Sequence, residues 1–234
     1  MAEKMQFFPL DATYRIVDGK AVINLYGRTE DGKQVCLLDN SFDPYFYVVP
    51  KAGIDVKEKL EKIRIEGERD IAFVTKTEAL LKKYLGREVL AVKVYTNLPG
   101  SVPVIRDLVK DWDMVEGTYE FDIPFARRYL IDRNITPMML HEATGDFAGQ
   151  NYKIPVFRAE NIVQITGDTL HNPKILAFDI ETYSPFDLAI DAEKNPIIML
   201  SFYAEDFRKV FVWKKFATEL EYVEFVGSEA ELIR

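Results

Sequence analysis

The chain has 234 residues, of which 48% are hydrophobic, so it is long enough to bury the cores of one or two soluble, globular domains. Its 30 basic and 38 acidic side chains give a formal net charge of −8, which excludes a broadly basic protein that coats nucleic acid. Any nucleic-acid contact must therefore be local. The one cysteine, Cys36, excludes an intramolecular disulfide and a multi-cysteine zinc site, so we expect a reducing, cytoplasmic setting. The apolar runs are too short to cross a bilayer, and no membrane role is expected.

The first part of the chain mixes short strand patterns with short helical ones. Apolar residues at helical spacing predict helices at Ile54–Ile63 and Thr77–Tyr84. Runs of β-branched and aromatic residues predict strands. These runs are Lys20–Tyr26, Tyr45–Val49, Ile71–Val74 and Val89–Tyr95.

Two further helices carry start signals. Ser101–Trp112 begins with Ser101 as a predicted N-cap and Pro103 in its first turn. Asp122–Ile131 has the same start signals, with Asp122 as the predicted N-cap and Pro124 in the first turn. Together with the preceding strands, they predict an α+β domain over residues 1–138.

Residues 139–173 carry a weaker pattern of scattered glycines and polar residues, and we interpret them as a connector or an insertion. Within them, Val156–Ile165 has room for one or two short strands. His141 and His171 also lie here without ligand spacing to any cysteine, so we expect both at the surface rather than on a metal.

Residues 174–234 predict a second, strand-rich unit. Its apolar runs have the spacing of antiparallel neighbours, and they are Lys174–Phe178, Ile197–Tyr203 and Lys209–Trp213. Near the end of the chain, Ser228 and Glu231 have the spacing of a capping box, which predicts the start of a helix. Because a domain seldom ends on the first turns of a helix, we expect a fragment or one half of a split protein.

Two carboxylates stand at the end of the apolar run Ile175–Phe178, in the string Phe-Asp-Ile-Glu-Thr. Side chains alternate across a strand, so Asp179 and Glu181 should point to one side with about 6–7 Å between their Cα atoms. Acidic side chains hold hard divalent cations, and a pair of such ions can hydrolyse a phosphodiester. The pattern predicts part of a two-metal nuclease site, and a solvated strand end remains the alternative.

The wider string KILAFDIETYSP, followed by NPIIMLSFYAE and KVFVWKK, resembles the first exonuclease motif of family B DNA polymerases of the archaeal branch and the strands after it. The resemblance covers nearly the whole chain apart from about residues 139–171. It includes FDPYFY at 42–47, PGSVPVIR at 99–106, YEFDIPFARRYLID at 119–132 and YVEFVGSE at 222–229.

This resemblance implies a mixed α/β N-terminal domain followed by an incomplete 3′–5′ exonuclease unit of ribonuclease H-like fold. Asp179 and Glu181 match the catalytic, metal-binding carboxylates of the first motif, with Mg²⁺ or Mn²⁺ bound only in the complete site. Further acidic ligands come from two later motifs, Asn-x-x-x-Phe-Asp and Tyr-x-x-x-Asp. The first is absent, and Tyr183–Asp187 spells the second too early, in a loop with Pro185, so we interpret that match as coincidence. Alone, the chain should be a poor nuclease and no polymerase.

The resemblance also implies a pocket in the N-terminal domain that captures uracil in the single-stranded template. Such a pocket admits a flipped base and excludes thymine, because the C5 methyl group has no room. Gly100 and Phe121 replace more polar or hydroxylated residues that are usual in the family, which leaves the affinity open. The residues that match the pocket's motifs are Tyr14, Pro44, Tyr45, Pro99, Val102, Pro103, Arg106, Ile123, Pro124, Phe125 and Arg128.

For each of these residues a plainer role stays open. Val102 lies on the apolar face of its helix, and the two first-turn prolines suit ordinary capping. Arg128 either orders the pocket or contacts a phosphate. Basic residues form two small clusters that either contact phosphates or are only solvated: Lys82, Lys83 and Arg87, and separately Arg127, Arg128 and Arg133.

The leading hypothesis is the N-terminal part of an archaeal-type family B DNA polymerase, cytoplasmic and nucleoid-associated. Its expected partners are the single-stranded DNA template, the remainder of the polymerase as a separate chain or missing C-terminal part, and a sliding clamp through that remainder. Two alternatives stay open. One is an assembly subunit of a split polymerase with no activity of its own, and the other is an autonomous metal-dependent nuclease.

Overall fold

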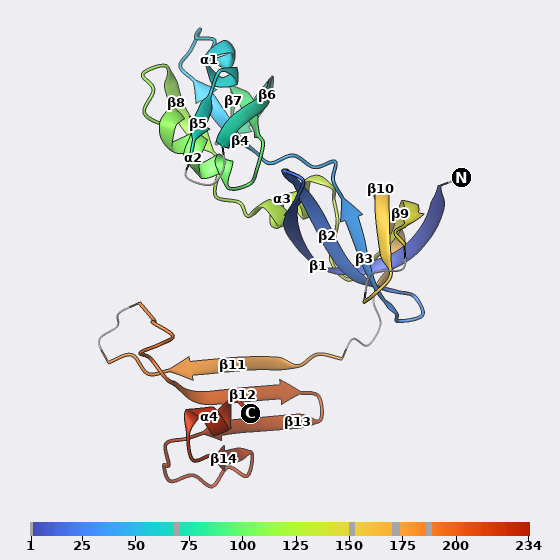
Figure 1. Ribbon diagram of the computed structural model, residues 1–234, viewed down its shortest axis with the longest axis vertical. Helices are drawn as coiled ribbons and strands as arrows, with labels where there is room; N and C mark the ends of the chain where they lie inside the picture. Colours follow the sequence, from blue (N-terminus) through green and yellow to red (C-terminus); the bar gives the residue numbers. More distant parts are fainter. Residues whose placement is uncertain (1, 68–70, 150–152, 170–173, 186–188) are drawn as a thin grey trace. The chain divides into compact units, whose positions relative to one another are not determined.

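The computed structural model describes residues 2–67, 71–149, 153–169, 174–185 and 189–234, and the chain divides into two compact units, Met1–Leu170 and His171–Arg234 (Figure 1). The first unit contains a closed barrel and a five-stranded sheet, and the second contains a four-stranded sheet. Strands far outnumber helices, in agreement with the predicted α+β class. None of the helices in these ranges has the length and hydropathy that a membrane span requires.

Five strands close the barrel in the order β1-β2-β3-β10-β9. Neighbouring strands are antiparallel except β3 and β10, which run parallel. Closure removes the free edges that an open sheet would leave unpaired. The strands are β1 (Glu3–Val17), β2 (Lys20–Thr29), β3 (Gln34–Asp39), β9 (Met139–Phe147) and β10 (Val156–Thr169).

Met139–Phe147 and Val156–Thr169 are thus strands of the barrel, where the sequence pattern suggested a connector. Residues 150–152 between them lie outside the described residues. β9 pairs with β1 and with β10, so without this segment the barrel could not close. The weak pattern has a physical reason at Gly145, where a Cβ atom would lie only 1.9 Å from the carbonyl oxygen of Arg158. Close backbone approach needs a residue without a side chain there, and such residues weaken a strand signal. Residues 170–173 of the predicted connector lie outside the described residues.

The predicted surface position of His141 is wrong. Its side chain is fully buried beside Phe7 in the barrel, with the two rings 6.1 Å apart. Its Nδ1 lies 2.8 Å from the carbonyl oxygen of Met139, and burial lowers the pKa of the ring. The ring is therefore a neutral core residue, since desolvation disfavours the charged form. His171 lies outside the described residues.

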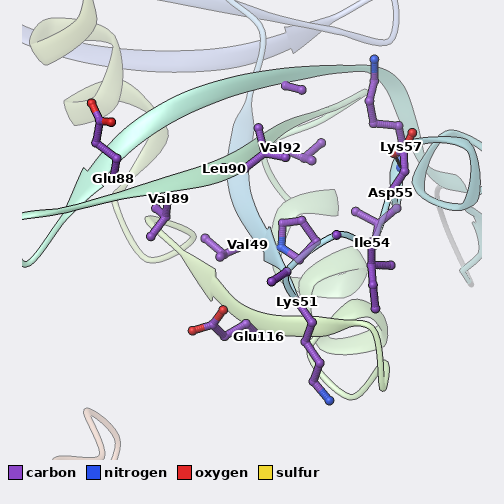
Figure 2. A pocket seen from close by; sticks show the side chains of 15 residues that line it. Val49, Lys51, Ile54, Asp55, Lys57, Glu88, Val89, Leu90, Val92 and Glu116 are labelled. Atoms are coloured by element: carbon purple, nitrogen blue, oxygen red, sulfur yellow. Dashed lines mark hydrogen bonds between the residues drawn. The ribbon is translucent and has the colours of Figure 1, made fainter.

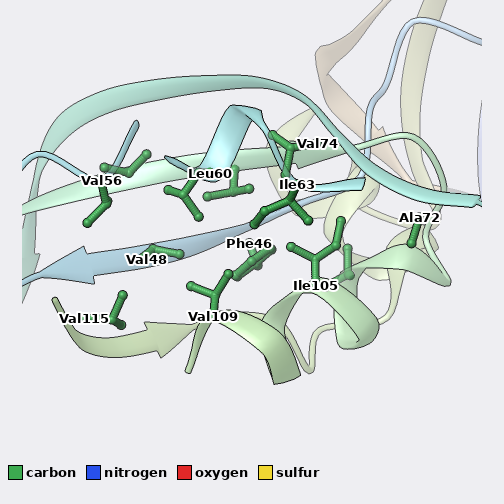
Figure 3. Close-up of a cluster of buried hydrophobic side chains, with 13 residues drawn as sticks. Phe46, Val48, Val56, Leu60, Ile63, Ala72, Val74, Ile105, Val109 and Val115 are labelled. Carbon is green, nitrogen blue, oxygen red and sulfur yellow. The ribbon is translucent and has the colours of Figure 1, made fainter. Parts of the chain in front are cut away.

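The other part of the first unit is a sheet in the order β5-β6-β7-β4-β8, with a hydrophobic core separate from that of the barrel. Helices α1 (Lys57–Glu61) and α2 (Ser101–Val109) cover one face of it, where Phe46, Leu60 and Ile105 are fully buried in a common apolar cluster (Figure 3). Burial of this cluster holds both helices against the sheet. The strands are β4 (Tyr45–Pro50), β5 (Arg64–Glu66), β6 (Ile71–Tyr84), β7 (Arg87–Thr96) and β8 (Val115–Tyr119).

The predicted helix at Thr77–Tyr84 is wrong, because these residues form the second half of β6. They pair antiparallel with Arg87–Val94 of β7 across the turn Leu85-Gly86, whose residues have φ values of 47° and 80°. Two-residue turns with positive φ match the twist of the flanking strands and align their pairing. Cross-strand pairing has outweighed the helical spacing of the apolar residues.

The other predicted helices are present with shifted starts. Ser101 is the first residue of α2, and Gly100 occupies the N-cap. Helix α3 (Phe125–Asp132) begins after Pro124 at its N-cap, so Asp122 does not cap it. Neither N-cap forms a side-chain hydrogen bond. The chain enters both helices through turns that tertiary packing holds in place.

The second unit is a sheet in the order β11-β12-β13-β14. β11, β12 and β13 are antiparallel neighbours, as predicted, and β14 runs parallel to β13. The predicted capping residue is confirmed, since Ser228 Oγ accepts a hydrogen bond of 3.2 Å from the Glu231 amide and begins α4 (Glu229–Leu232). The strands are β11 (Ala177–Thr182), β12 (Ile197–Ala204), β13 (Phe207–Val212) and β14 (Val223–Phe225).

Replacement of Gly145 by alanine should lower the free energy of unfolding by about 1–3 kcal/mol, because the new methyl group must displace backbone of the neighbouring strand. The matched control is Gly149→Ala, whose Cβ would meet no atom within 4 Å. Urea unfolding followed by circular dichroism measures both. Equal stability of the two variants would contradict the close packing of β9 on β10.

Candidate functional site

A cavity of about 280 Å³ opens in the first unit, between the barrel, the five-stranded sheet and the start of α3. Four stretches far apart in the sequence supply its walls. Nine of the eleven residues predicted for the pocket line it. The full lining is Tyr14, Pro44, Tyr45, Pro99, Gly100, Val102, Phe121, Asp122, Ile123, Pro124, Phe125 and Arg128.

The remaining two predicted residues lie beside the cavity on α2. Pro103 is exposed in the first turn of the helix. The guanidinium carbon of Arg106 lies 4.0 Å from the ring centroid of Phe121, which does line the cavity. Arg106 therefore contacts the pocket wall at Phe121, and its Nε is buried without a hydrogen-bond partner among the described residues.

The walls of the cavity are mainly aromatic and proline side chains. Tyr14 of β1 meets the ring of Phe125 edge-on, with the ring centroids 5.2 Å apart. Phe125 is also part of the barrel core, so the base of this wall is anchored there. Val102 is nearly fully buried and belongs to the apolar cluster below α2. Two wall residues, Phe125 and Val102, are thus anchored in the two hydrophobic cores of the unit, which fixes the position of this part of the wall.

Arg128 holds the wall of the cavity in place through hydrogen bonds to two neighbouring residues. Its side chain is buried, its Nη2 donates a 2.8 Å hydrogen bond to the carbonyl oxygen of Glu120, and its Nη1 pairs with the Glu120 carboxylate. Nη1 also donates to the Tyr45 hydroxyl oxygen at 3.1 Å, and that hydroxyl donates to Asp132 Oδ2 at 2.5 Å. Of its two predicted roles, the geometry favours ordering over phosphate contact, because the guanidinium is already occupied.

The same network holds a strained backbone. Glu120 has φ of +58°, a conformation that residues other than glycine seldom adopt. Two bonds from Arg128, one to the carboxylate and one to the carbonyl, hold Glu120 in this conformation just before the wall residues 121–124. Burial would lower the pKa of Arg128, but its bonds to Glu120 and Tyr45 outweigh this and raise it. Burial, followed by the bond to Asp132, raises the pKa of Tyr45, so its hydroxyl stays protonated.

Sequence reasoning missed Glu120 and Asp132 as parts of the site. Both stand inside the string that matches the polymerase motifs, and Asp132 lies one helical turn after Arg128, which was the available signal. The string does not show that Tyr45, from a distant strand, completes the network.

The predicted basic cluster around α3 is not a free cationic patch. Arg128 is buried, and Arg133 Nη2 donates a 2.6 Å hydrogen bond to Ser41 Oγ and lies 3.6 Å from Asp39 Oδ2. Only Arg127 of the three is exposed without a described ion pair. Of the other predicted cluster, at the β6–β7 hairpin, Lys82 lies over the ring of Tyr47, and Lys82, Lys83 and Arg87 form no ion pair with the described residues.

A second cavity, of about 610 Å³, lies at the end of β4 and beside β7 (Figure 2). Its floor is apolar, with Val49 and Leu90, and its rim carries Lys51 and Lys57 together with Glu88 and Glu116. The mixed charges on the rim favour no single class of ligand. None of the residues predicted for a site lines it.

In the second unit, the two carboxylates lie within β11 rather than after its end. The strand begins at Ala177 instead of Lys174 and keeps unbroken register with β12 up to Glu181. That register places Asp179 and Glu181 on one face, both exposed. Asp179 Oδ1 accepts a 3.0 Å hydrogen bond from the amide of Ile180.

The pair suits divalent ions only in part. Carboxylate oxygens are the ligands that Mg²⁺ and Mn²⁺ prefer, and exposed oxygens on one strand face are free to bind them. Among the described residues, however, no group of three or more acidic, histidine or cysteine side chains gathers at one place. Asp187 of the coincidental Tyr-x-x-x-Asp match lies outside the described residues. Asp179 and Glu181 alone do not make a complete two-metal site.

Residues 116–234 match the family model for DNA polymerase family B, exonuclease domain, which is more than half of the chain. The chain belongs to DNA polymerase family B. It is 36% identical to a DNA polymerase of Pyrococcus glycovorans over 225 residues, which is 96% of this chain and 24% of that protein. A DNA polymerase of Thermococcus kodakarensis is 34% identical over 96% of this chain and 11% of its own length.

The fold of this family B chain is similar to the structure of the family B DNA polymerase from Pyrobaculum calidifontis. The TM-score is 0.65 at 28% identity, over 90% of this chain and 27% of that one. The chain thus spans about a quarter or less of the length of these curated relatives. Exonuclease domains of this family generally use divalent metal ions.

Replacement of Arg128 by leucine should lower the free energy of unfolding by about 1.5–3 kcal/mol, because charge-assisted bonds to Glu120 are lost and Tyr45 loses a donor. Urea unfolding is the measurement. Arg127→Leu, one residue earlier on the same helix and exposed, should change the value by less than about 0.5 kcal/mol. Similar losses in both variants would show that Arg128 does not hold the wall.

Proposed function

We propose that the chain is the template-reading N-terminal part of a family B DNA polymerase, together with the first strands of its 3′–5′ exonuclease. The observation that carries the proposal is the convergence of nine predicted residues, from four separate stretches, on one cavity. Its volume of about 280 Å³ is at the lower limit of ligand pockets, which suits a single base better than a longer ligand.

The chemistry of the cavity supports uracil as the ligand. Its walls are apolar and aromatic, so a flipped base would be recognised through backbone groups at its polar edge. Val102 and Pro99 narrow it, and a pocket of rigid shape excludes a base with an added methyl group by steric contact. Gly100 and Phe121, which depart from the usual family residues, both line the cavity and therefore bear on its affinity.

The exonuclease part of the proposal rests on β11. Asp179 and Glu181 would bind Mg²⁺ or Mn²⁺ in a ribonuclease H-like unit whose other ligands come from outside this chain. The bound ions would activate water and stabilise the leaving oxygen. The two side chains would position the ions at the 3′ end of the DNA. Through the remainder of the polymerase, the chain would act with a sliding clamp in the cytoplasm, at the nucleoid.

A second candidate function, an assembly subunit of a split polymerase, has one observation in its favour. Phe178 and Ile180 of the edge strand β11 are 69% and 46% exposed, which is typical of a surface that another chain covers. This function and the template-reading function are compatible in one molecule.

Fluorescence anisotropy with two single-stranded DNAs, identical except for one uracil in place of thymine, tests the pocket. The uracil strand should bind at least several-fold tighter, and Val102→Gln should abolish the difference because a longer polar side chain fills the cavity.

The control for this measurement is Val104→Gln, on the same helix but exposed, which should keep the preference. If wild type binds both strands equally, the proposed pocket function fails.

The carboxylate pair is tested in a polymerase that carries this chain as its N-terminal part. Asp179→Ala or Glu181→Ala should reduce Mg²⁺-dependent release of 3′ nucleotides by at least 100-fold, because each removes an ion ligand. Glu205→Gln, exposed after β12 in the same unit, should retain the activity. The 234-residue chain alone should release none, and degradation abolished by Asp179→Ala would instead support an autonomous nuclease.

A further inference from the structure

The five-stranded sheet has a second face, opposite α1 and α2, that carries aromatic and basic side chains. Register places them together: Tyr47 of β4 pairs with Tyr119 of β8 and with Lys93 of β7. Alternation along β6 and β7 adds the others to the same side. We name this set the tyrosine face, and it consists of Tyr47, Tyr84, Tyr95, Tyr119, Lys82 and Lys93.

We propose that the tyrosine face is a second contact for single-stranded DNA, which binds nucleotides of the same strand whose base enters the 280 Å³ cavity. The proposal rests on the template-binding function proposed above. Aromatic side chains interleaved with cations are the usual means of holding single strands, because bases stack on the rings and lysines meet the phosphates.

The lysines of this face are half-buried, and the ammonium group of each lies over a tyrosine ring. Lys93 Nζ lies 3.7 Å from the ring centroid of Tyr45 and 4.9 Å from that of Tyr95, and Lys82 Nζ lies 4.6 Å from that of Tyr47. Within the described part of the chain, neither lysine has an ion-pair partner. Burial lowers the pKa of Lys93, so an anionic partner there would stabilise its charged form.

The acidic residues of the same face are already engaged. The Tyr95 hydroxyl donates a 3.0 Å hydrogen bond to Glu78 Oε2, and Arg128 holds Glu120. Arg128 therefore balances the charge of Glu120, whereas Glu78 keeps its own charge. Lys82 and Lys93 outnumber Glu78 on this face, although the whole chain is acidic.

One end of the tyrosine face is hollowed into a cavity of about 220 Å³. Tyr47 and Tyr119 line it, and the ring of Tyr84 lies 4.8 Å from that of Tyr119. Lys82 and Lys83 stand on the rim, and Tyr84 is 45% exposed. Tyr47 is almost fully buried, so Tyr84 and Tyr119 are the rings open to a stacked base, with its phosphate at the basic rim.

The face is continuous with the first cavity. Tyr45 lines that cavity and packs against Tyr47 and Tyr95, with ring centroids 5.5 and 5.7 Å apart. Glu120 lines the 220 Å³ cavity and holds Arg128, which lines the first. This continuity argues for one DNA strand as the occupant of both, whereas an apolar protein partner would find charged lysines across the face.

Fluorescence anisotropy with the full chain tests the proposal. It uses uracil-containing single strands of roughly 6 and roughly 20 nucleotides, because single-strand-binding modules engage about 4–16 nucleotides and only the longer strand would reach both contacts. Lys82→Gln with Lys83→Gln, and separately Tyr84→Ala, should weaken binding of the longer strand at least fivefold. Neither should change binding of the shorter strand or the ratio of uracil to thymine affinity. Lys57→Gln with Lys62→Gln removes the same charge from α1, on the other face, and should leave both strands within twofold.

The outcomes separate this proposal from the proposed pocket. If wild type shows no uracil preference, the pocket function fails, and the face is still judged by its own variants on the longer strand. Equal weakening by the face variants and the α1 variant would overturn the face, because only net charge would then act. Unchanged binding in the face variants would overturn it too, and so would loss of uracil preference in them, which would show a disturbed pocket instead.

Discussion

The buried guanidinium of Arg128 is the interaction on which the candidate pocket depends. It joins Glu120, at the end of the sheet, to Tyr45, at the start of β4, and Asp132 completes the network from the helix that carries the arginine. A buried arginine is tolerated only when its donors are satisfied, and here each bond also holds a wall residue in place. The hydrogen bonds that satisfy the buried guanidinium are therefore the same ones that hold the cavity wall in position.

Helix α3 transmits this constraint to the barrel. The residue after Arg128, Tyr129, is fully buried among the barrel side chains, and its hydroxyl donates a 3.0 Å hydrogen bond to Asp39 at the end of β3. Phe125, one turn earlier, packs both on Tyr14 and in the barrel core. A short helix of eight residues thus connects the barrel core to the wall of the pocket.

Charge is distributed in a way that composition does not show. The chain is acidic overall, but on the tyrosine face Arg128 pairs with Glu120, and Lys82 and Lys93 have no ion-pair partner among the described residues. In the second unit the exposed charges are acidic instead, since Asp179 and Glu181 lie on one exposed face of β11. Membership of DNA polymerase family B fits both arrangements, because cations suit the phosphates of a strand and carboxylates suit the metal ions of an exonuclease.

The sequence by itself determined the family, the α+β class, the capping residue Ser228 and most of the pocket lining, since local strings such as residues 119–132 carry their own recognisable pattern. Only the tertiary structure decided that residues 77–84 are a strand, that β9 and β10 close the barrel and that His141 is core. These depend on pairing between distant segments, which outweighs local periodicity. The role of Arg128 needed the same information, because its partner Tyr45 lies 83 residues away and a local pattern cannot show which distant groups satisfy a buried charge.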